Sequence, residues 1–395
     1  MISSNELILT INGGSSSIKF AVFTRGNLSN RSLSGYIDRI GLSGTTLTIT
    51  DPETQQASRL PVNVISRSAV VNFLIDWLEK QAIFDRLKVV GHRIVQGMDH
   101  QEPESITQEL LNELHRFRAY DPDHLPTEIE LIERFQKRHP HLLQVACFDT
   151  AFHRTMPRVA QLLPIPRRFD RKGIRRYGFH GISYAYLLEE LGRVASLEVA
   201  QSRIILAHLG NGASLSAVRD GKSLDTSMSF TPTSGLPMGT RSGDLDPGVA
   251  WYLMQSEPLT SQQVNHLINH ESGLLGVSET SSDMRDLLKQ QSVDSRAAEA
   301  VDLFCYQTRK WVGAFAAVLN GLDTLVFSGG IGENAPEVRT RICAGLNFLG
   351  IALDQQRNEA NASVISTDES KVIVRVIPTN EEGMMAQLVS RLLKD

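Results

Sequence analysis

The stretch LILTINGGSSSIKFAVF, residues 7–23, places two short apolar runs on either side of small, turn-forming residues. The runs at 7–11 and 18–23 are rich in Ile, Leu, Val and Phe, which favour strands. Asn, Gly and Ser between them favour a tight turn. The sequence therefore predicts a β-hairpin with a small-residue tip near the start of the chain.

A second stretch repeats this design. Apolar runs at 204–207 and 215–218 flank His208-Leu209-Gly210-Asn211-Gly212-Ala213-Ser214, and Asp220-Gly221 forms the next turn. The similarity of the two hairpins indicates an internal duplication. A third element is a strand at 322–327 that runs into the loop Ser328-Gly329-Gly330-Ile331-Gly332-Glu333-Asn334, with a helix expected before it at 297–319.

Between the two hairpins, segments with apolar residues at helical spacing alternate with short runs that are typical of strands. Apolar residues at helical spacing predict helices at 71–80, 106–120 and 127–139. Val89 and Val90 form a short strand that leads into Gly91-His92-Arg93, and Val145–Phe148 delivers Asp149 at its carboxyl end, where α/β sheets hold ligands. The pattern predicts two α/β domains that face a cleft, with a boundary near residue 150.

Composition excludes several classes of function. With 395 residues, of which 41% are hydrophobic, the chain can bury a large core. Lys+Arg 40 against Asp+Glu 44 gives a net charge of -4, so no overall basic field attracts nucleic acid or an anionic membrane. No apolar run approaches the ~18 residues of a membrane span, and the first residues lack a signal-peptide layout. We expect a cytoplasmic protein that binds neither nucleic acid nor membrane.

The three cysteines, Cys147, Cys305 and Cys343, are far apart and odd in number. Their spacing fits neither a disulfide framework nor a zinc site. We expect buried, small apolar residues in a reducing cytosol.

Each of the three glycine segments has the chemistry to hold phosphate. Backbone N–H groups at a small-residue turn approach oxyanions closely, and the first tip adds hydroxyl groups, Asn12 and Lys19. Neither hairpin tip matches the Walker or dinucleotide pattern, and taken alone each is more often an ordinary turn. The three together, in this order, favour a nucleotide site.

The motifs and their order resemble those of the acetate kinase family, nearly from end to end of the chain. The matching segments are Asn12–Lys19, Gly91–Arg93, Phe148–His153, Tyr177–Gly181, His208–Gly212, Met238–Asp244, Gly329–Asn334 and Pro378–Glu382. The resemblance implies an α/β fold of two duplicated RNase H-like domains of the actin and sugar-kinase type around a nucleotide cleft. The expected domains are residues 1–150 and 151–382, with a C-terminal helix at 383–395 as a candidate completion of the first.

The resemblance also implies reversible, direct in-line phosphoryl transfer from ATP to acetate, which gives ADP and acetyl phosphate. By the resemblance, Arg93 holds the substrate carboxylate, and Arg241 stabilises the phosphoryl group in flight. His180 donates a hydrogen bond to that group, and Asp149 orients an arginine or assists the carboxylate. From the residues alone, the arginines could form surface ion pairs, His180 could be a core histidine, and Asp149 could be a helix N-cap.

Further ligand contacts follow from the same resemblance. Asn12 and Glu381 are expected to anchor Mg²⁺, with Mn²⁺ as the alternative ion, and the protein is expected to be a homodimer. The acid-binding residues are expected to be Arg93, Val95, His124, Phe179 and Pro232. The nucleotide-binding residues are expected to be Lys19, His208, Leu209, Gly210, Asn211, Gly212, Asp283, Met284, Arg285, Gly330, Ile331, Gly332, Glu333 and Asn334.

Two segments depart from the family pattern. After Arg93 the chain reads Val95-Gln96-Gly97-Met98-Asp99 where the family usually has a histidine and paired glycines, and Asp123 replaces an apolar residue expected near the acyl methyl group. A carboxylate in an apolar pocket costs free energy unless it is paired or turned away. Either Asp123 points to solvent, or the pocket differs.

Three alternatives remain at this stage. A propionate or other short-chain fatty acid kinase is the nearest, because one methylene contributes only ~1–3 kcal/mol to discrimination. A non-catalytic ATP-switched module of the actin and chaperone type would need an added partner-binding region, and none is visible. GTP or CTP could replace ATP, whereas the loop at 330–334 argues against a pyrophosphate-dependent relative.

Overall fold

The computed structural model describes residues 6–14, 17–41, 44–52, 54, 56–64 and 66–393. The chain divides into two compact units. One runs up to Ala151 and resumes at Asn380, and the other is Phe152–Thr379. Ser15 and Ser16, in the tip of the first predicted hairpin, lie outside the described residues.

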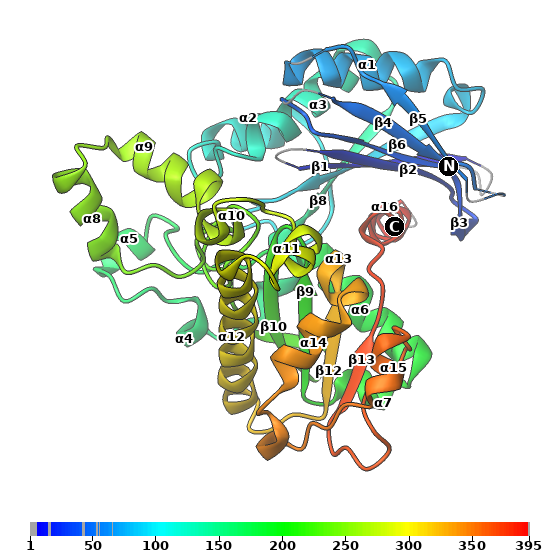
Figure 1. Ribbon diagram of the computed structural model, residues 1–395. Helices are drawn as coiled ribbons and strands as arrows, with labels where there is room; N and C mark the ends of the chain where they lie inside the picture. Colours follow the sequence, from blue (N-terminus) through cyan, green and yellow to red (C-terminus); the bar gives the residue numbers. More distant parts are fainter. Residues whose placement is uncertain are drawn as a thin grey trace. The chain divides into compact units, whose positions relative to one another are not determined.

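The first unit is built on a sheet with strand order β5-β4-β3-β2-β1-β6-β8-β7 (Figure 1). β1 pairs antiparallel with β2, which confirms the predicted hairpin, and parallel with β6, which in turn is parallel to β8. The strands are β1 (Leu7–Gly13), β2 (Ile18–Thr24), β3 (Asn27–Asp38), β4 (Thr46–Thr50), β5 (Ala57–Pro61), β6 (Leu87–Ile94), β7 (Glu104–Ser105) and β8 (Leu143–Phe148).

β6 is longer than predicted, since it continues through Gly91-His92-Arg93 to Ile94. Gly91 allows this because it lies under the C-terminal helix, where an added Cβ would come within 2.8 Å of Val389 Cγ2. Arg93 is therefore a strand residue near the carboxyl end of β6, with a fixed backbone, and not a residue of a loop.

Helices cover both faces of this sheet (Figure 1). They are α1 (Arg67–Glu79), α2 (Gln108–Phe117), α3 (Leu125–Arg138) and α16 (Glu381–Leu392), with a short 3-10 turn, η1 (Phe84–Arg86). The three helices predicted at 71–80, 106–120 and 127–139 are confirmed as α1, α2 and α3. Ser66 and Thr107 cap α1 and α2, where their side chains accept hydrogen bonds from exposed backbone amides.

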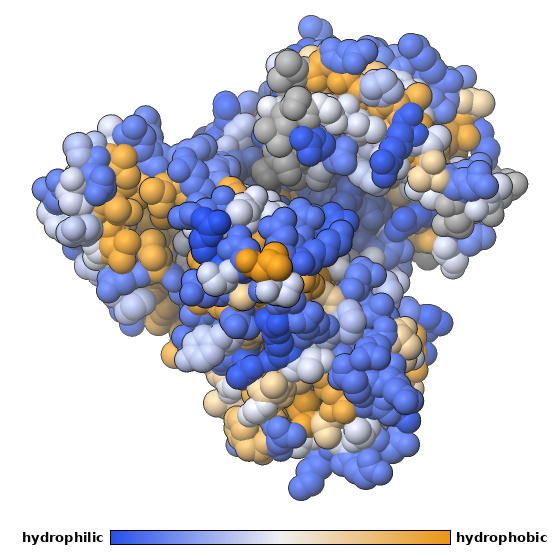
Figure 2. All heavy atoms as spheres, viewed as in Figure 1, coloured by the Kyte–Doolittle hydropathy of each residue, from blue (hydrophilic) through white to orange (hydrophobic). Residues whose placement is uncertain are grey.

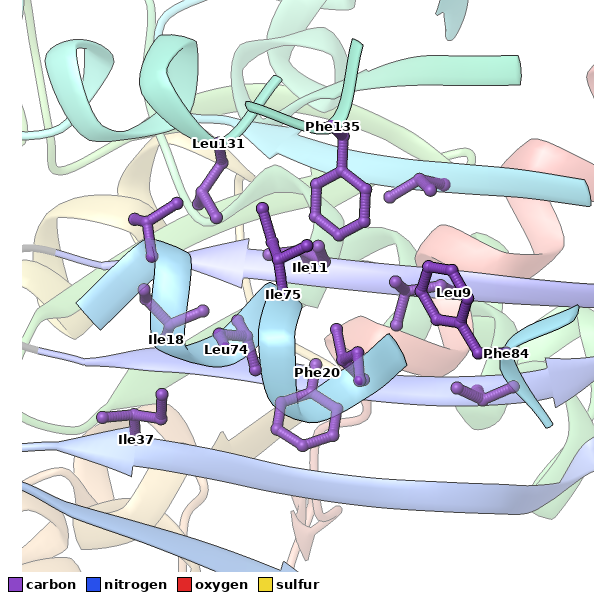
Figure 3. Packing of buried hydrophobic residues seen from close by; sticks show 14 of the residues in the cluster. Leu9, Ile11, Ile18, Phe20, Ile37, Leu74, Ile75, Phe84, Leu131 and Phe135 are labelled. Atoms are coloured by element: carbon purple, nitrogen blue, oxygen red, sulfur yellow. The ribbon is translucent and has the colours of Figure 1, made fainter. Parts of the chain in front are cut away.

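The core of the first unit lies between the sheet and α1 with α3. Alternate residues of the strands point into it, as expected for period-two strands (Figure 3). The packed side chains include Leu9, Ile11, Ile18, Phe20, Leu74, Ile75, Leu131 and Phe135. Each such side chain contributes about 1.5–3 kcal/mol when fully buried, so this layer fixes the strand ends that carry the polar residues described below.

The second unit repeats the plan of the first. Its sheet has the order β11-β10-β9-β12-β13, antiparallel from β9 to β11 and parallel from β9 through β12 to β13. The strands are β9 (Ile204–Leu209), β10 (Ala213–Arg219), β11 (Lys222–Thr226), β12 (Thr324–Ser328) and β13 (Ile373–Val376). Order and direction equal those of β3-β2-β1-β6-β8, which confirms the duplication.

Helix α6 packs on the sheet of the second unit through Tyr184, Leu187 and Leu191, while α12 lies along β10. The helices and short turns are η2 (Asp149–Thr155), α4 (Arg158–Gln161), α5 (Arg167–Asp170), α6 (Gly181–Val194), α7 (Leu197–Gln201), α8 (Pro247–Ser256), α9 (Ser261–His266), η3 (Leu267–Glu271), α10 (Gly273–Ser278), α11 (Met284–Gln290), α12 (Ser295–Val318), α13 (Gly329–Asn334), α14 (Pro336–Cys343), η4 (Asn347–Leu349) and α15 (Gln355–Glu359).

The predicted loop at 328–334 is instead the helix α13, which corrects the sequence-based expectation. Gly329 has a φ of 75°, and an added Cβ there would lie 2.6 Å from the Leu209 carbonyl oxygen. A glycine in this left-handed conformation turns β12 directly into a helix without an intervening loop.

All three cysteines are buried and free, as expected. Burial raises the pKa of each thiol to about 12, so none is a reactive thiolate. Within the described ranges, no helix combines the length and the apolar character that crossing a membrane requires.

Candidate active site

Arg93 of the first unit is held by hydrogen bonds to two polar side chains. Its Nη2 donates to Asp149 Oδ2 at 2.6 Å and its Nη1 to Asn12 Oδ1 at 3.0 Å. Asn12, Arg93 and Asp149 come from the carboxyl ends of β1, β6 and β8, three neighbouring parallel strands. Ligands of α/β sheets bind at this edge.

The electrostatics favour a permanently charged Arg93. Burial opposes the charge, but Asp149, Glu381 and Glu128 outweigh it and raise the pKa of Arg93. Its side chain is 12% exposed, and Nε is buried without a hydrogen-bond partner among the described residues. Burial closes Nε–H to a ligand, so an anionic acceptor would meet the N–H groups of Nη1 and Nη2 that Asn12 and Asp149 do not use.

The two residues predicted to hold a metal lie next to each other. Asn12 Nδ2 donates to Glu381 Oε2 at 2.8 Å, and Asn12 Oδ1 accepts from Arg93. Among the described residues there is no cluster of three or more His, Cys, Asp or Glu side chains placed for a metal. One carboxylate fits Mg²⁺ when substrate phosphates supply further oxygen ligands, and Glu381 has the carboxylate of the two.

The other residues of the first unit that are predicted to bind the acid are buried. Val95 is 2% exposed, and its amide donates to the carboxyl group of Glu128, a residue that no sequence signal had indicated. His124 Nδ1 lies 2.9 Å from Asp121 Oδ1. Lys19, predicted to bind nucleotide, is exposed on β2 opposite Asn12.

Asp123 has a cationic neighbour. Asp123 is half-buried. Burial lowers the pKa of Arg67, and the negative charge of Asp123 offsets part of this lowering. Arg67 also donates to Thr127 Oγ1 at 2.5 Å, so it is held on the first turn of α3. A positive charge nearby reduces the cost of partly burying the carboxylate of Asp123.

In the second unit, His180 and Arg241 both approach Gly212. A Cβ added to Gly212 would lie 3.3 Å from His180 Nε2 and 4.0 Å from Arg241 Nη1. His180 has a φ of 58°, an uncommon conformation for a residue with a side chain that is often found at functional sites. The two cationic or hydrogen-bonding side chains therefore converge on one small space at the tip of the second hairpin.

The His180 ring is held on both sides. Its Nδ1 lies 2.9 Å from Ser214 Oγ, and the ring stands 4.4 Å, centroid to centroid, from that of His208. His208 Nδ1 is 2.8 Å from Ser183 Oγ. Neither Ser183 nor Ser214 was predicted as a site residue, because serines in strands and helices carry no distinctive signal of what they contact.

The segment around Arg241 depends on close backbone packing. Gly239 N donates to Asn211 O at 3.0 Å, and a Cβ at Gly239 would lie only 2.2 Å from Asn211 Oδ1. Arg241 Nη1 itself donates to Pro232 O at 3.2 Å. The predicted residues Asn211, Pro232 and Arg241 are thus brought together.

Two of the three predicted nucleotide segments of the second unit, at 208–212 and 330–334, are neighbours. They follow the adjacent parallel strands β9 and β12, and a Cβ added to Gly210 would lie 3.8 Å from Gly330 N. Glu333 braces this region, since its Oε1 accepts from Gly329 N at 2.8 Å and from Thr379 N at 3.1 Å. Asn334 Nδ2 donates back to Gly330 O.

Arg339, which no sequence signal had indicated, fixes the end of α13. It is fully buried and donates to Gly332 O at 2.8 Å, Glu333 O at 3.0 Å and Asn358 Oδ1 at 2.8 Å. Burial lowers the pKa of Arg339 to about 10, and no carboxylate of the described chain pairs with it. Its hydrogen bonds satisfy carbonyls that the helix end leaves open.

The predicted segment Asp283-Met284-Arg285 divides between core and surface. Asp283 caps α11 and forms a two-point ion pair with Arg285, whose side chain is 84% exposed. Met284 is 3% exposed, so its side chain belongs to the core. Phe179 is 1% exposed, and its carbonyl oxygen accepts from His153 Nε2.

Comparison with known proteins adds independent findings. The family model of the acetokinase family matches residues 7–387. The chain is 42% identical to an acetate kinase of Methylocella silvestris over 98% of each chain. It is 41% identical to a propionate kinase of Citrobacter rodentium, with 98% of this chain and 96% of the other covered.

Solved structures agree. The crystal structure of Porphyromonas gingivalis acetate kinase matches with a TM-score of 0.87 and 36% identity over 98% of this chain and 100% of the other. The crystal structure of a propionate kinase from Francisella tularensis matches with a TM-score of 0.90 and 36% identity over 97% of this chain and 98% of the other. Together with the repeated sheet topology, these matches confirm the predicted fold of two duplicated RNase H-like domains.

Proposed function

Because the chain belongs to the acetokinase family, which transfers phosphoryl groups to a carboxyl acceptor, we propose that it phosphorylates acetate with Mg²⁺ and ATP, reversibly. Family membership removes the alternative of a non-catalytic ATP switch. The observation that carries the proposal is the charged Arg93, which Asp149 and Asn12 hold at the carboxyl ends of β1, β6 and β8 with further N–H groups of Nη1 and Nη2 left for a carboxylate.

The proposed reaction is a direct in-line displacement. Arg93 holds the acetate carboxylate, one oxygen of which attacks the γ-phosphorus while the bond to the ADP oxygen breaks and its electron pair leaves with ADP. A carboxylate is ionised at neutral pH, and the charges balance without a proton, so the site needs no general base. The same geometry serves the reverse reaction.

His180 and Arg241 are assigned to the transferring phosphoryl group. Tyr184 hydroxyl and Ser214 Oγ are hydrogen-bonded, and Ser214 Oγ contacts His180 Nδ1. With Ser214 donating to Nδ1, the proton of the neutral imidazole sits on Nε2, which is the atom near Gly212. Nε2–H and the Arg241 guanidinium would then stabilise negative charge on phosphoryl oxygens.

Metal and nucleotide roles follow the donor sets described above. When bound with the nucleotide, Mg²⁺, or Mn²⁺ in its place, would offset the charge of the phosphates. Glu381 is the candidate ligand from the protein. The segments at 208–212 and 329–334 would offer backbone amides to the nucleotide.

Acetate and propionate kinases are both among the relatives, so the acid requires its own support. Val95 of the first unit and Phe179 and Pro232 of the second are buried apolar residues, and Asp123 has Arg67 as a charged neighbour. Apolar side chains suit the methyl group of acetate, which is the first candidate acid; propionate is the second.

The direct test is to incubate the protein with Mg²⁺, ATP and acids from formate to butyrate, and to trap acyl phosphate with hydroxylamine. We expect the highest kcat/KM with acetate. A higher value with propionate would replace acetate by the second candidate. No acyl phosphate with any acid would refute the proposed reaction.

Replacing Arg241 by alanine should lower kcat by about 10³-fold, because a guanidinium that stabilises transition-state charge contributes on that scale. Steady-state kinetics would measure this, with the thermal midpoint as a check on folding. Arg219→Ala, a change at an exposed arginine that pairs with Asp220, serves as the control. A near-normal kcat in Arg241→Ala would remove Arg241 from this role.

We also infer a homodimer that uses α8. Val249, Trp251 and Tyr252 are 40%, 64% and 66% exposed, and hydrophobic residues gather over α8 and α9 (Figure 2). Exposed aromatic and aliphatic side chains in one patch mark protein interfaces. Sedimentation velocity should give twice the chain mass, and Trp251→Glu should shift the equilibrium toward monomer. A wild-type monomer at micromolar concentration would contradict the inference.

A further inference from the structure

Glu128 of α3 is a buried acidic residue that the proposed reaction does not yet use. It is 1% exposed, and the Val95 amide donates to its carboxyl group, at 3.2 Å from both Oε1 and Oε2. Val95 follows the end of β6, two residues after Arg93. A helix side chain thus holds the backbone just beyond the proposed acceptor-binding arginine.

The tip of β1 contacts the same side chain. A Cβ added to Gly13 would lie 3.9 Å from Glu128 Cγ and 3.1 Å from Leu131 Cδ1. Glu128 therefore lies between the ends of β1 and β6, the strands whose residues Asn12 and Arg93 are hydrogen-bonded to each other. Its position links three elements at the edge of the sheet.

Burying a carboxyl group here is unfavourable, since no cation forms an ion pair with it in the described part of the chain. Burial, and then the nearby Asp121, raise the pKa of Glu128 well above its usual range, although Arg93 and the Val95 amide oppose them. The hydrogen bond from the Val95 amide offsets part of the cost of this burial.

We propose that Glu128 is a positioning residue of the acceptor site: its carboxyl group fixes the Val95 amide and thereby the direction in which Arg93 meets the acceptor carboxylate. This inference rests on the proposed function. Asp149 and Asn12 hold the guanidinium end of Arg93, while Glu128 holds the main chain that follows it. Loss of Glu128 leaves the amide unpaired in a buried place and lets the segment after β6 shift.

The test compares two substitutions at Glu128. Glu128→Gln keeps an acceptor oxygen for the Val95 amide and should keep the acid KM within about threefold of the wild type. Glu128→Met has a similar length without an acceptor, and should raise the acid KM about tenfold, the effect of one lost buried hydrogen bond. The KM for ATP should change less than about twofold in both. Glu133→Met, at an exposed glutamate of the same helix, is the matched control.

Three results are decisive. An unchanged acid KM in Glu128→Met would overturn the inference, as would equal rises in the KM for acid and for ATP, which indicate a general structural effect. If Glu128→Met does not fold, Glu128→Asp, one methylene too short to reach Val95, gives the same comparison. A wild-type protein that phosphorylates no acid would instead contradict the proposed function, so the two failures are distinguishable.

Discussion

The buried ion pair between Arg93 and Asp149 is the constraint on which the proposed acceptor site depends. Asp149 is fully buried, and the two side chains meet at 2.6 Å. Removing two charges from water costs more than their attraction usually returns, so such a pair is weak evidence for stability. Here the ion pair fixes the position of the Arg93 guanidinium. The carboxyl ends of β6 and β8 thus hold a cation at the edge of the sheet, where the proposed acceptor would bind.

The second unit repeats the strand order and strand directions of the first, and its polar residues also lie near strand ends. Its hairpin tip holds Gly212 beside His180 Nε2 and Arg241 Nη1, whereas the polar residue of the first hairpin, Asn12, lies within β1 opposite Lys19. The adjacent segment after β12 is braced from within by Glu333 and by the buried Arg339. Duplication thus provides two strand-end platforms, and each carries different side chains.

Much of the fold could be predicted from sequence because its signals are local. Both hairpins follow from apolar runs around small-residue tips, and α1 to α3 follow from helical periodicity. Local signals failed at α13, where Gly329 turns a strand straight into a helix. The site was harder to predict from the residues alone. The contact between Asn12 and Glu381 joins residues 369 positions apart, and only the family resemblance indicated such pairs. Glu128 and Arg339 stayed hidden, because nothing in the sequence around a buried charge shows what it will contact.

The most direct measurement of the central claim is the KM for acetate and for ATP in Arg93→Lys, with Arg116→Lys on the exposed face of α2 as control. Lysine keeps the charge but loses the planar pair of donors that suits a carboxylate. The account predicts an acetate KM at least about tenfold above the wild type, and an ATP KM within about twofold of it. An acetate KM that stays at the wild-type value would contradict the assignment of Arg93 to the acceptor.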